Sequence, residues 1–223
     1  MNTSQLRPAH ELAGRFGCKA IAYGGPGSAK TPLVNTCPRP VMCVTEPGML
    51  SMRTSKVPCW EANTPERIKE FFEWLKLSNE TKGFDTVAVD SLSQLAEIIL
   101  IRALDQNAHG LKAYGVMSET VQEYLTQMFY MPQKHIYLIC KEGINDVTKK
   151  RTPWFPGKEL PVKVPHMYDE ILHIGQHNVP GFIGPVHSIQ TFDTFDTLAR
   201  DRSGKLNSYE EPNMSKLFAK CMT

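Results

Sequence analysis

The feature that most constrains this chain is a short apolar run followed by a glycine-rich turn and a Lys-Thr pair. The apolar run covers residues 20–23, the turn covers 24–29, and Lys30 and Thr31 follow. In the pattern G-x-x-x-x-G-K-[ST], backbone N–H groups converge on a β-phosphate, the lysine reaches the β- and γ-oxygens, and the hydroxyl ligates magnesium. The sequence therefore predicts a strand, a phosphate-binding loop and the first turn of a helix.

One position departs from the pattern, because Ala29 stands where a glycine normally precedes the lysine. A methyl group is small and fits a helical first turn, so we expect nucleotide binding to survive. A dinucleotide-binding G-x-G-x-x-G starting at Gly25 is excluded, since Lys30 takes the place of its last glycine. A Gly/Pro turn that binds nothing remains the alternative. The predicted nucleotide-binding residues are Gly24, Gly25, Pro26, Gly27, Ser28, Ala29, Lys30, Thr31 and Pro32.

Two later apolar runs end in acidic residues. Residues 41–45 precede Glu46, and residues 86–89 precede Asp90. Continuous apolar runs are typical of strands buried on both faces of a parallel sheet, and open α/β sheets place their ligands at the carboxyl ends of such strands. Asp90 is therefore predicted to join Thr31 in holding magnesium. The predicted ligands are ATP and Mg²⁺.

The remaining periodicity continues the alternation of strands and helices. Residues 64–75, 91–104 and 118–131 are predicted as helices, 107–115 as a loop, and short helices are expected at 30–35 and 212–222. Further strands are predicted at 135–140 and 169–174, with 186–194 as a hairpin-like edge. The pair His173-x-x-x-His177 lies in a strand setting, which argues against a metal site. We expect an N-terminal extension over 1–16 and one α/β domain over 17–223.

Composition narrows the function classes. The 223 residues carry a net charge of +2, so binding to a polyanion requires a local patch. No run approaches the ~20 apolar residues that span a bilayer, and we expect a cytoplasmic protein without a membrane partner. The six cysteines form no C-x-x-C pair, which favours reduced thiols. A zinc site among Cys37, Cys43 and Cys59 would have the wrong spacing.

Positive charge accumulates where the periodicity stops, between residues 141 and 163. Lys149, Lys150 and Arg151 stand next to Trp154 and Phe155. Basic loops with exposed aromatic rings bind single-stranded nucleic acid by neutralising phosphates and stacking on bases. The alternative is a solvated basic face whose aromatic residues attach the loop to the core.

Taken together, these motifs resemble the RecA family, and most closely the small phage-encoded RecA-like ATPases that anneal single strands in recombination. The resemblance covers nearly the whole chain from Cys18 onward. It rests on the segments Tyr-Gly-Gly-Pro-Gly-Ser-Ala-Lys-Thr at 23–31, Val-Thr-Glu at 44–46, Val-Ala-Val-Asp-Ser at 87–91, Leu-Ile-Cys-Lys at 138–141 and Ala-Arg-Asp-Arg-Ser-Gly at 199–204.

The resemblance implies a RecA-like P-loop core with a mostly parallel sheet, a late antiparallel edge, and strand 135–140 between the phosphate-loop strand and the Asp90 strand. It also implies that Glu46 polarises the attacking water and that Lys141 senses the γ-phosphate, where RecA itself has a glutamine. Arg200 and Arg202 would reach the ATP of a neighbouring subunit. The implied partners are single-stranded DNA, further copies of the chain in a ring or filament, and a single-strand DNA-binding protein.

These observations predict an ATPase, cytoplasmic in the host if phage-encoded, that promotes strand annealing. Two other readings stay open. One is a P-loop ATPase of another class, such as a helicase loader, a terminase or a small-molecule kinase. The other is a nucleotide-dependent scaffold with negligible turnover, which Ala29 supports.

Overall fold

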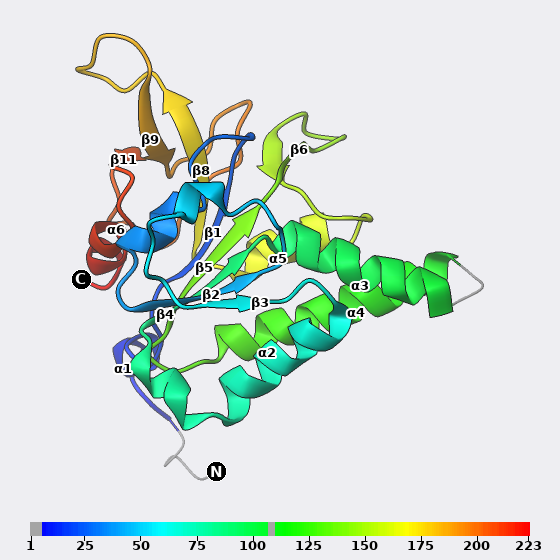
Figure 1. Ribbon diagram of the computed structural model, residues 1–223. Helices are drawn as coiled ribbons and strands as arrows, with labels where there is room; N and C mark the ends of the chain where they lie inside the picture. Colours follow the sequence, from blue (N-terminus) through cyan, green and yellow to red (C-terminus); the bar gives the residue numbers. More distant parts are fainter. Residues whose placement is uncertain (1–5, 107–109) are drawn as a thin grey trace.

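A central β-sheet organises the chain, which is described here by a computed structural model over residues 6–106 and 110–223. Within these residues the sheet has nine strands in the order β11-β9-β8-β1-β5-β4-β2-β3, and β10 also pairs with β8. Figure 1 shows the sheet running through the middle of the molecule. The strands are β1 (Lys19–Tyr23), β2 (Pro40–Val44), β3 (Cys59–Glu61), β4 (Thr86–Asp90), β5 (His135–Cys140), β8 (Glu170–His177), β9 (Val186–Gln190), β10 (Arg200–Asp201) and β11 (Tyr209–Glu210).

The central strands are parallel and the late strands are antiparallel. Strand β1 pairs in parallel with both β5 and β8, and β4 pairs in parallel with β5 and β2. Strands β9, β10 and β11 join the sheet in antiparallel register. Strand β5 thus lies between the phosphate-loop strand and the Asp90 strand. This topology confirms the predicted RecA-like α/β fold with its late antiparallel edge.

Helices cover both faces of the sheet. The longer helices α2 (Pro65–Leu77), α3 (Leu92–Gln106) and α4 (Gly110–Phe129) lie together on one side, and α6 lies apart from them (Figure 1). The 3₁₀ helix η2 (Pro32–Thr36) and α6 (Met214–Cys221) contribute to the core of the other face. The remaining helices are α1 (Ala9–Ala13), η3 (Leu50–Met52), η4 (Asn79–Gly83) and α5 (Leu160–Met167).

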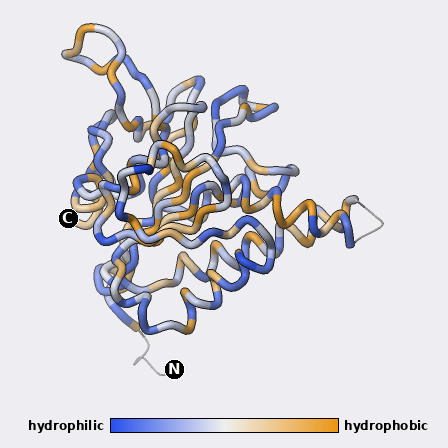
Figure 2. Tube along the Cα trace, viewed as in Figure 1, coloured by the Kyte–Doolittle hydropathy of each residue, from blue (hydrophilic) through white to orange (hydrophobic). Residues whose placement is uncertain are grey.

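Alternating side chains of the central strands supply two hydrophobic cores. In β1, Ile21 and Tyr23 belong to the cluster under α2, α3 and α4, whereas Ala20 and Ala22 belong to the cluster under η2 and α6. Successive side chains of a strand point to opposite faces, so an uninterrupted apolar run serves both cores. The apolar colouring of the interior strands in Figure 2 follows this arrangement.

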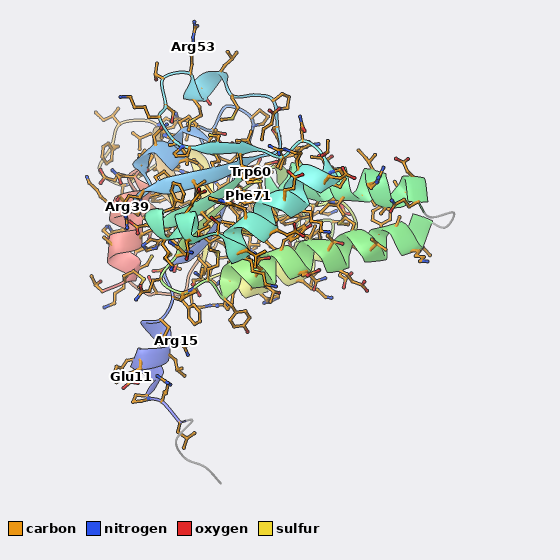
Figure 3. The ribbon with its side chains drawn as sticks, turned by 60° about the horizontal axis from the view of Figure 1, so that its bottom comes forward. Glu11, Arg15, Arg39, Arg53, Trp60 and Phe71 are labelled. Atoms are coloured by element: carbon orange, nitrogen blue, oxygen red, sulfur yellow. The ribbon has the colours of Figure 1, made fainter. Side chains whose placement is uncertain are left out.

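Helix α2 shows how closely local sequence determines an element. The Thr64 side chain accepts a hydrogen bond from the Arg67 N–H at 3.2 Å, and a proline occupies the first turn. The apolar residues at helical spacing, Ile68, Phe71, Phe72 and Leu75, are buried as predicted. Phe71 also meets Trp60 of β3, with ring centroids 6.0 Å apart (Figure 3).

Three segments differ from the sequence-based expectations. Helix α4 begins at Gly110, so the predicted loop at 107–115 is wrong from residue 110 onward, and residues 107–109 lie outside the described residues. Ala113, Met117 and Val121 are buried one turn apart and extend the apolar stripe toward the helix start. After the phosphate loop there is a 3₁₀ helix rather than an α-helix, and it ends before Pro38.

The predicted loop between 141 and 163 is also partly ordered. Strands β6 (Glu142–Ile144) and β7 (Arg151–Pro153) pair as a two-stranded antiparallel sheet, and α5 begins at Leu160. Such short strands carry too few residues for a recognisable period-two pattern. Residues 142–153 therefore form a hairpin, called the β6–β7 hairpin below. Its turn carries Lys149 and Lys150, and Arg151 begins its second strand.

Helix α1 lies outside this arrangement, because none of its residues is buried and it projects from the body of the molecule with Glu11 and Arg15 (Figure 3). None of the helices described is both long enough and apolar enough to span a membrane.

Candidate nucleotide site

The phosphate loop follows β1 at the carboxyl end of the central strands, and its first glycine is fixed by packing. A Cβ on Gly24 would lie 2.2 Å from the carbonyl oxygen of Ile174 in β8. Only glycine can therefore join β1 to the loop while β8 runs alongside. Gly25 has open space around it, whereas Gly27 adopts a left-handed conformation with φ of 76°.

Ala29 also adopts a left-handed conformation, with φ of 61°. The expectation that its methyl group fits a helical first turn is therefore wrong. A left-handed L-residue costs roughly 1–2 kcal/mol, which explains why the phosphate-loop pattern has glycine at this position. The chain tolerates the strain because the loop is anchored at both ends.

Lys30 lies against the inside of the loop. Its ammonium nitrogen Nζ donates hydrogen bonds to Gly24 O at 2.6 Å, Gly25 O at 3.0 Å and Ser28 Oγ at 3.0 Å. Burial lowers the pKa of Lys30, and nearby Asp90 opposes that effect. A cation at this point of the loop is suited to bind phosphate oxygens.

Thr31 and Asp90 meet at the base of the loop. Thr31 Oγ1 donates to Asp90 Oδ2 at 2.5 Å, and Asp90 is buried at the end of β4. Burial raises the pKa of Asp90, while the Thr31 hydrogen bond lowers it. A hydroxyl and a carboxylate are hard oxygen ligands of the kind that Mg²⁺ prefers, so the donor set fits the predicted magnesium.

Glu46 is held beside this pair, as its place after β2 predicts. Glu46 Oε1 accepts a hydrogen bond from Ser91 Oγ at 2.5 Å, and Ser91 directly follows Asp90. The neighbouring Thr45 fixes the same turn, because Thr45 N donates to Asp90 O at 2.8 Å and Thr45 Oγ1 donates to Ser91 O at 2.9 Å. Three strand ends thus converge on one site.

Lys141 points away from the loop. Its ammonium group forms an ion pair with Glu97 of α3 and donates to Gln94 Oε1 at 2.9 Å. The next residue, Glu142, instead lines a cleft of about 320 Å³ beside the loop, together with Gly25, Pro26, Gly27, Ser28, Arg151, His173 and His187. Sequence analysis assigned a role to Lys141 and none to Glu142.

A hydrogen-bonded chain leads from Glu142 into the sheet. Glu142 Oε2 and His173 Nε2 are 2.9 Å apart, His173 Nδ1 and His177 Nε2 are 2.9 Å apart, and His177 Nδ1 lies 2.8 Å from Ser188 Oγ. The two imidazole rings meet beside Gly175, where a Cβ atom would be in ordinary van der Waals contact with both. Both histidines lie in strand β8, so the predicted strand is correct. Their imidazole rings are nevertheless in contact.

The β8–β9 hairpin also contacts the loop directly. His187 Nε2 of β9 lies 2.9 Å from the carbonyl oxygen of Ser28. Strands β8 and β9 thus both contact the loop, on the side of β1 opposite Asp90. Sequence reasoning missed His187, because only the antiparallel turn of β9 brings it to the loop.

Arg200 and Arg202 lie at the other end of the sheet. Strand β10 pairs Arg200 with Ile171 near the start of β8, three residues before Ile174, which contacts the phosphate loop. Arg200 Nη2 donates to Pro165 O at 2.6 Å and to Tyr168 O, and Arg202 pairs with Asp169 at 3.3 Å. Neither guanidinium contacts the phosphate loop of its own chain.

The residues predicted to bind nucleic acid separate in the structure. Lys149 and Arg151 are exposed, although Arg151 pairs with Asp196 at 3.8 Å, and Lys150 forms an ion pair with Asp193. Phe155 is 2% exposed and belongs to the core, so its predicted stacking role is wrong. Trp154 is half-buried. Lys141 Nζ lies 5.8 Å from the centroid of the Trp154 ring, and the Trp154 side chain lies against Gly143. The alternative that the aromatic residues anchor the segment is correct for Phe155.

The strand order, the phosphate loop and the Thr31–Asp90 pair define a P-loop nucleotide-binding domain of RecA-like topology. The chain belongs to the family described as "AAA domain", which it matches over residues 17–203. Among solved structures it is similar to the crystal structure of a KaiC-like protein from the hyperthermophilic archaeon Pyrococcus horikoshii OT3, with 11% identity over 78% of each chain and a TM-score of 0.45. No curated protein is detectably similar to the chain in sequence.

Proposed function

We propose that this protein binds ATP with Mg²⁺ and hydrolyses it at the phosphate loop. The observation that carries the proposal is the convergence of Thr31, Asp90 and Glu46 at the base of the loop, with Thr31 Oγ1 2.5 Å from Asp90 Oδ2 and Glu46 Oε1 2.5 Å from Ser91 Oγ. Oxygen ligands, a half-buried ammonium and a carboxylate that can orient water are the parts that phosphoryl transfer to water requires.

Each residue has a distinct role in this proposal. Lys30 exchanges its hydrogen bonds to the loop carbonyls for bonds to β- and γ-phosphate oxygens. Thr31 and Asp90 would hold Mg²⁺, which neutralises developing charge on the phosphates. Glu46 accepts a hydrogen bond from the attacking water and aligns it, while Ser91 fixes the carboxylate. Glu142 and Arg151 line the cleft beside Gly25 and Ser28 and are the remaining charged groups next to the phosphates.

Lys30→Ala tests the nucleotide site. Calorimetry should show loss of ATP binding in this variant, because no other side chain supplies the half-buried cation, while circular dichroism stays unchanged. Lys216→Ala is the matched control, since Lys216 lies on α6 and is exposed. Equal ATP affinity in Lys30→Ala and wild type would refute the assignment of the loop.

The finer proposal is that the protein binds single-stranded DNA and promotes annealing, as its resemblance to phage recombination ATPases suggests. Support comes from the β6–β7 hairpin, where Lys149 and Arg151 are exposed. Arg151 is the first residue of β7 and also lines the nucleotide cleft. Exposed cations neutralise backbone phosphates, and their proximity to the cleft offers a path from DNA binding to turnover. A single-strand DNA-binding protein would act as a helper.

Salt dependence tests the DNA contact. Lys149→Ala/Arg151→Ala should weaken binding to an oligonucleotide and reduce the slope of log affinity against log salt by roughly 0.7 per lost phosphate contact, or up to about 1.4. Lys82→Ala/Lys205→Ala removes the same charge from exposed sites elsewhere. An unchanged slope in the hairpin variant would exclude this hairpin as the DNA contact.

We further propose that ATP lies between subunits of a ring or filament. Arg202 is the better candidate for a group supplied to a neighbour, because its ion pair with Asp169 is partly exposed, whereas Arg200 is engaged by two carbonyl oxygens of its own chain. A Lys30→Ala chain mixed with an Arg202→Ala chain should regain partial hydrolysis at mixed interfaces. No recovery at any ratio, with co-assembly verified, would refute a shared site.

One observation favours a second function, a nucleotide-dependent scaffold with negligible turnover. The left-handed backbone at Ala29 places a methyl group on the loop immediately before Lys30. Steady-state phosphate release in the presence and absence of single-stranded DNA distinguishes the two. Assembly that responds to ATP, without measurable release, would support the scaffold.

A further inference from the structure

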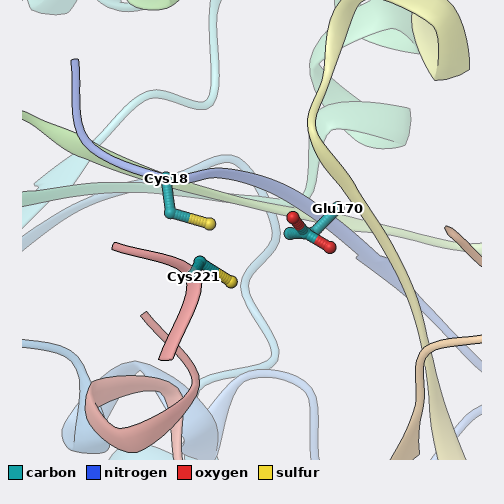
Figure 4. A group of neighbouring side chains, drawn as sticks. All are labelled: Cys18, Glu170 and Cys221. Carbon is teal, nitrogen blue, oxygen red and sulfur yellow. The ribbon is translucent and has the colours of Figure 1, made fainter. Parts of the chain in front are cut away.

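Two cysteines and a glutamate meet at the edge of the sheet opposite the nucleotide site. Cys18 directly precedes β1, Glu170 begins β8, and Cys221 ends α6. Their sulfur and carboxylate oxygen atoms all lie within 4.8 Å of one another. Figure 4 shows Cys18 and Cys221 with their sulfur atoms on the side of the Glu170 carboxylate. These three residues are called the Cys18 cluster below.

Glu170 is a buried acid that has few partners. It has no exposed surface, and its Oε1 atom accepts a long bond of 3.3 Å from Ser203 N. The Glu170 and Asp201 carboxyl groups also share a hydrogen bond, which requires a proton on one of them. A buried carboxylate is unfavourable unless a cation or a proton compensates it, so a metal ion could take the place of that proton.

No nearby side-chain cation provides that partner. Lys19 lies next to the cluster, but its Nζ atom donates to Lys134 O at 2.6 Å and to Met131 O at 3.4 Å. Arg202 pairs with Asp169 Oδ1 at 3.3 Å and donates to His166 O at 3.2 Å. Both cations line the cavity beside the cluster, yet among the described residues neither forms an ion pair with Glu170.

We propose that Cys18, Cys221 and Glu170 bind one Zn²⁺ ion. Two thiolates and a carboxylate are ligands that zinc accepts together, and the harder ions Mg²⁺ and Ca²⁺ disfavour sulfur. Zinc lies ~2.3 Å from sulfur and ~2.0–2.2 Å from oxygen, so tetrahedral ligand atoms stand roughly 3.3–3.8 Å apart. The observed separations reach this geometry with small side-chain rotations.

The fourth position faces a cavity. A space of about 250 Å³ adjoins all three ligands. Two further carboxylates of this region are engaged. Asp169, which lines the cavity, pairs with Arg202 through Oδ1 at 3.3 Å. Asp201 accepts from Ser203 Oγ and Gly204 N at Oδ1 and from Leu206 N at Oδ2. A water molecule therefore completes the coordination. On binding, zinc replaces the protons of the two thiols and of the glutamic acid, which are released to solvent.

The site would join parts of the chain that are distant in sequence. Cys18 and Glu170 lie at the starts of adjacent parallel strands, and Cys221 lies at the end of the helix whose Leu217 and Phe218 cover one core. Zinc would thus connect α6 to the strand that leads into the phosphate loop. Its effect is expected on stability, independent of ATP affinity.

Metal substitution in the full chain tests the proposal. Purified under reducing conditions and freed of metal, the protein should bind one Zn²⁺ per chain, and Co²⁺ in its place should give the near-ultraviolet absorption of thiolate-to-cobalt charge transfer. Cys221→Ser should remove that absorption and weaken Zn²⁺ binding about 100-fold or more, because loss of even an outer-shell partner typically costs 10–100-fold. Glu170→Gln should weaken Zn²⁺ binding while keeping part of the thiolate signal.

The controls separate this site from other thiols. Cys59→Ser removes an exposed cysteine outside the cluster and should leave zinc affinity and the cobalt spectrum unchanged. Cys221 is only half-buried, so its variant should fold, and circular dichroism of the metal-free proteins verifies this. Equal zinc affinity in Cys221→Ser and wild type would overturn the proposal. Mass spectrometric detection of a Cys18–Cys221 disulfide in the reduced preparation would overturn it as well.

Discussion

The two edges of the parallel sheet use polar residues in different ways. At the carboxyl edge, Thr31, Asp90, Glu46 and Ser91 bond to one another, and Lys30 is held by loop carbonyls. At the opposite edge, Arg200 and Arg202 bond to backbone carbonyls at the end of α5, and Glu170 is a buried acid with few partners. The same strands thus carry a prearranged candidate nucleotide site at one end and fold-stabilising contacts at the other.

The largest difference between the edges should appear in turnover. Glu46→Gln keeps the size of the side chain but removes the carboxylate that orients water, so hydrolysis should fall by about 10²–10⁴-fold while ATP affinity persists. The control Glu211→Gln changes an exposed acid outside the site and should leave turnover unchanged. Phosphate-release kinetics measure both, and full activity in Glu46→Gln would reduce Glu46 to an ordinary loop acid.

The histidine pair behind the phosphate loop makes the carboxyl edge sensitive to acid. Burial lowers the pKa of His177 from 6.5 to about 4, and His173 adds to that effect. Between these pH values the unfolded chain binds more protons than the folded chain, so stability falls as the pH is lowered from about 6.5 to about 4. The loss is at most on the order of 3 kcal/mol.

Urea unfolding at several pH values measures this loss. His177→Gln should flatten the dependence of the free energy of unfolding on pH, because the variant has no imidazole to protonate. His10→Gln on the exposed helix α1 should follow wild type. Identical slopes in His177→Gln and wild type would show that another group controls acid stability.

At the opposite edge, Arg200 is expected to affect folding and not the nucleotide. Arg200→Ala leaves the carbonyl oxygens of Pro165 and Tyr168 without their donor, which should lower the free energy of unfolding by ~1–3 kcal/mol. Arg202→Ala loses a partly exposed ion pair and should cost ~1 kcal/mol or less. Denaturant melts rank the two variants, and the reverse ranking would contradict the structural role given to Arg200.

The smallest effect is expected at Ala29. Ala29→Gly removes left-handed strain of roughly 1–2 kcal/mol but increases the entropy of the unfolded chain by about 0.4–1 kcal/mol, so a net gain of ~1 kcal/mol or less is expected. ATP affinity should stay equal or rise. Ala29→Val provides the opposite test, because a branched side chain at φ of 61° should destabilise the loop. Destabilisation by glycine would contradict the strained conformation.

Sequence alone predicted the parts of this molecule that rest on local patterns. Continuous apolar runs identified the central strands, because a strand buried on both faces has no polar positions to interrupt it. The acids Glu46 and Asp90 were found because each follows such a run. Their convergence followed from the rule that parallel strands end at one edge.

The errors arose where tertiary contacts decide. Glu142 could not be recognised, because its partner His173 lies 31 residues away along the chain. Phe155 was taken for an exposed ring since neighbouring prolines and charges suggested a loop, yet the core beneath α3 and α4 buries it. The location of Arg200 depends on the antiparallel pairing of β10 with β8, which its sequence motif does not reveal, and its predicted role toward a neighbouring subunit stays a prediction.

The close approach of Gly24 to β8 has a consequence for how related sequences should be recognised. A side chain is excluded at Gly24 by the Ile174 carbonyl, while Gly25 has open space and position 29 already accepts alanine. A saturation library of the loop should therefore tolerate replacements at Gly25 and reject them at Gly24. For chains built on this backbone, a search pattern that demands glycine before the lysine would discard functional loops, and one anchored on Gly24, Lys30 and Thr31 would retain them.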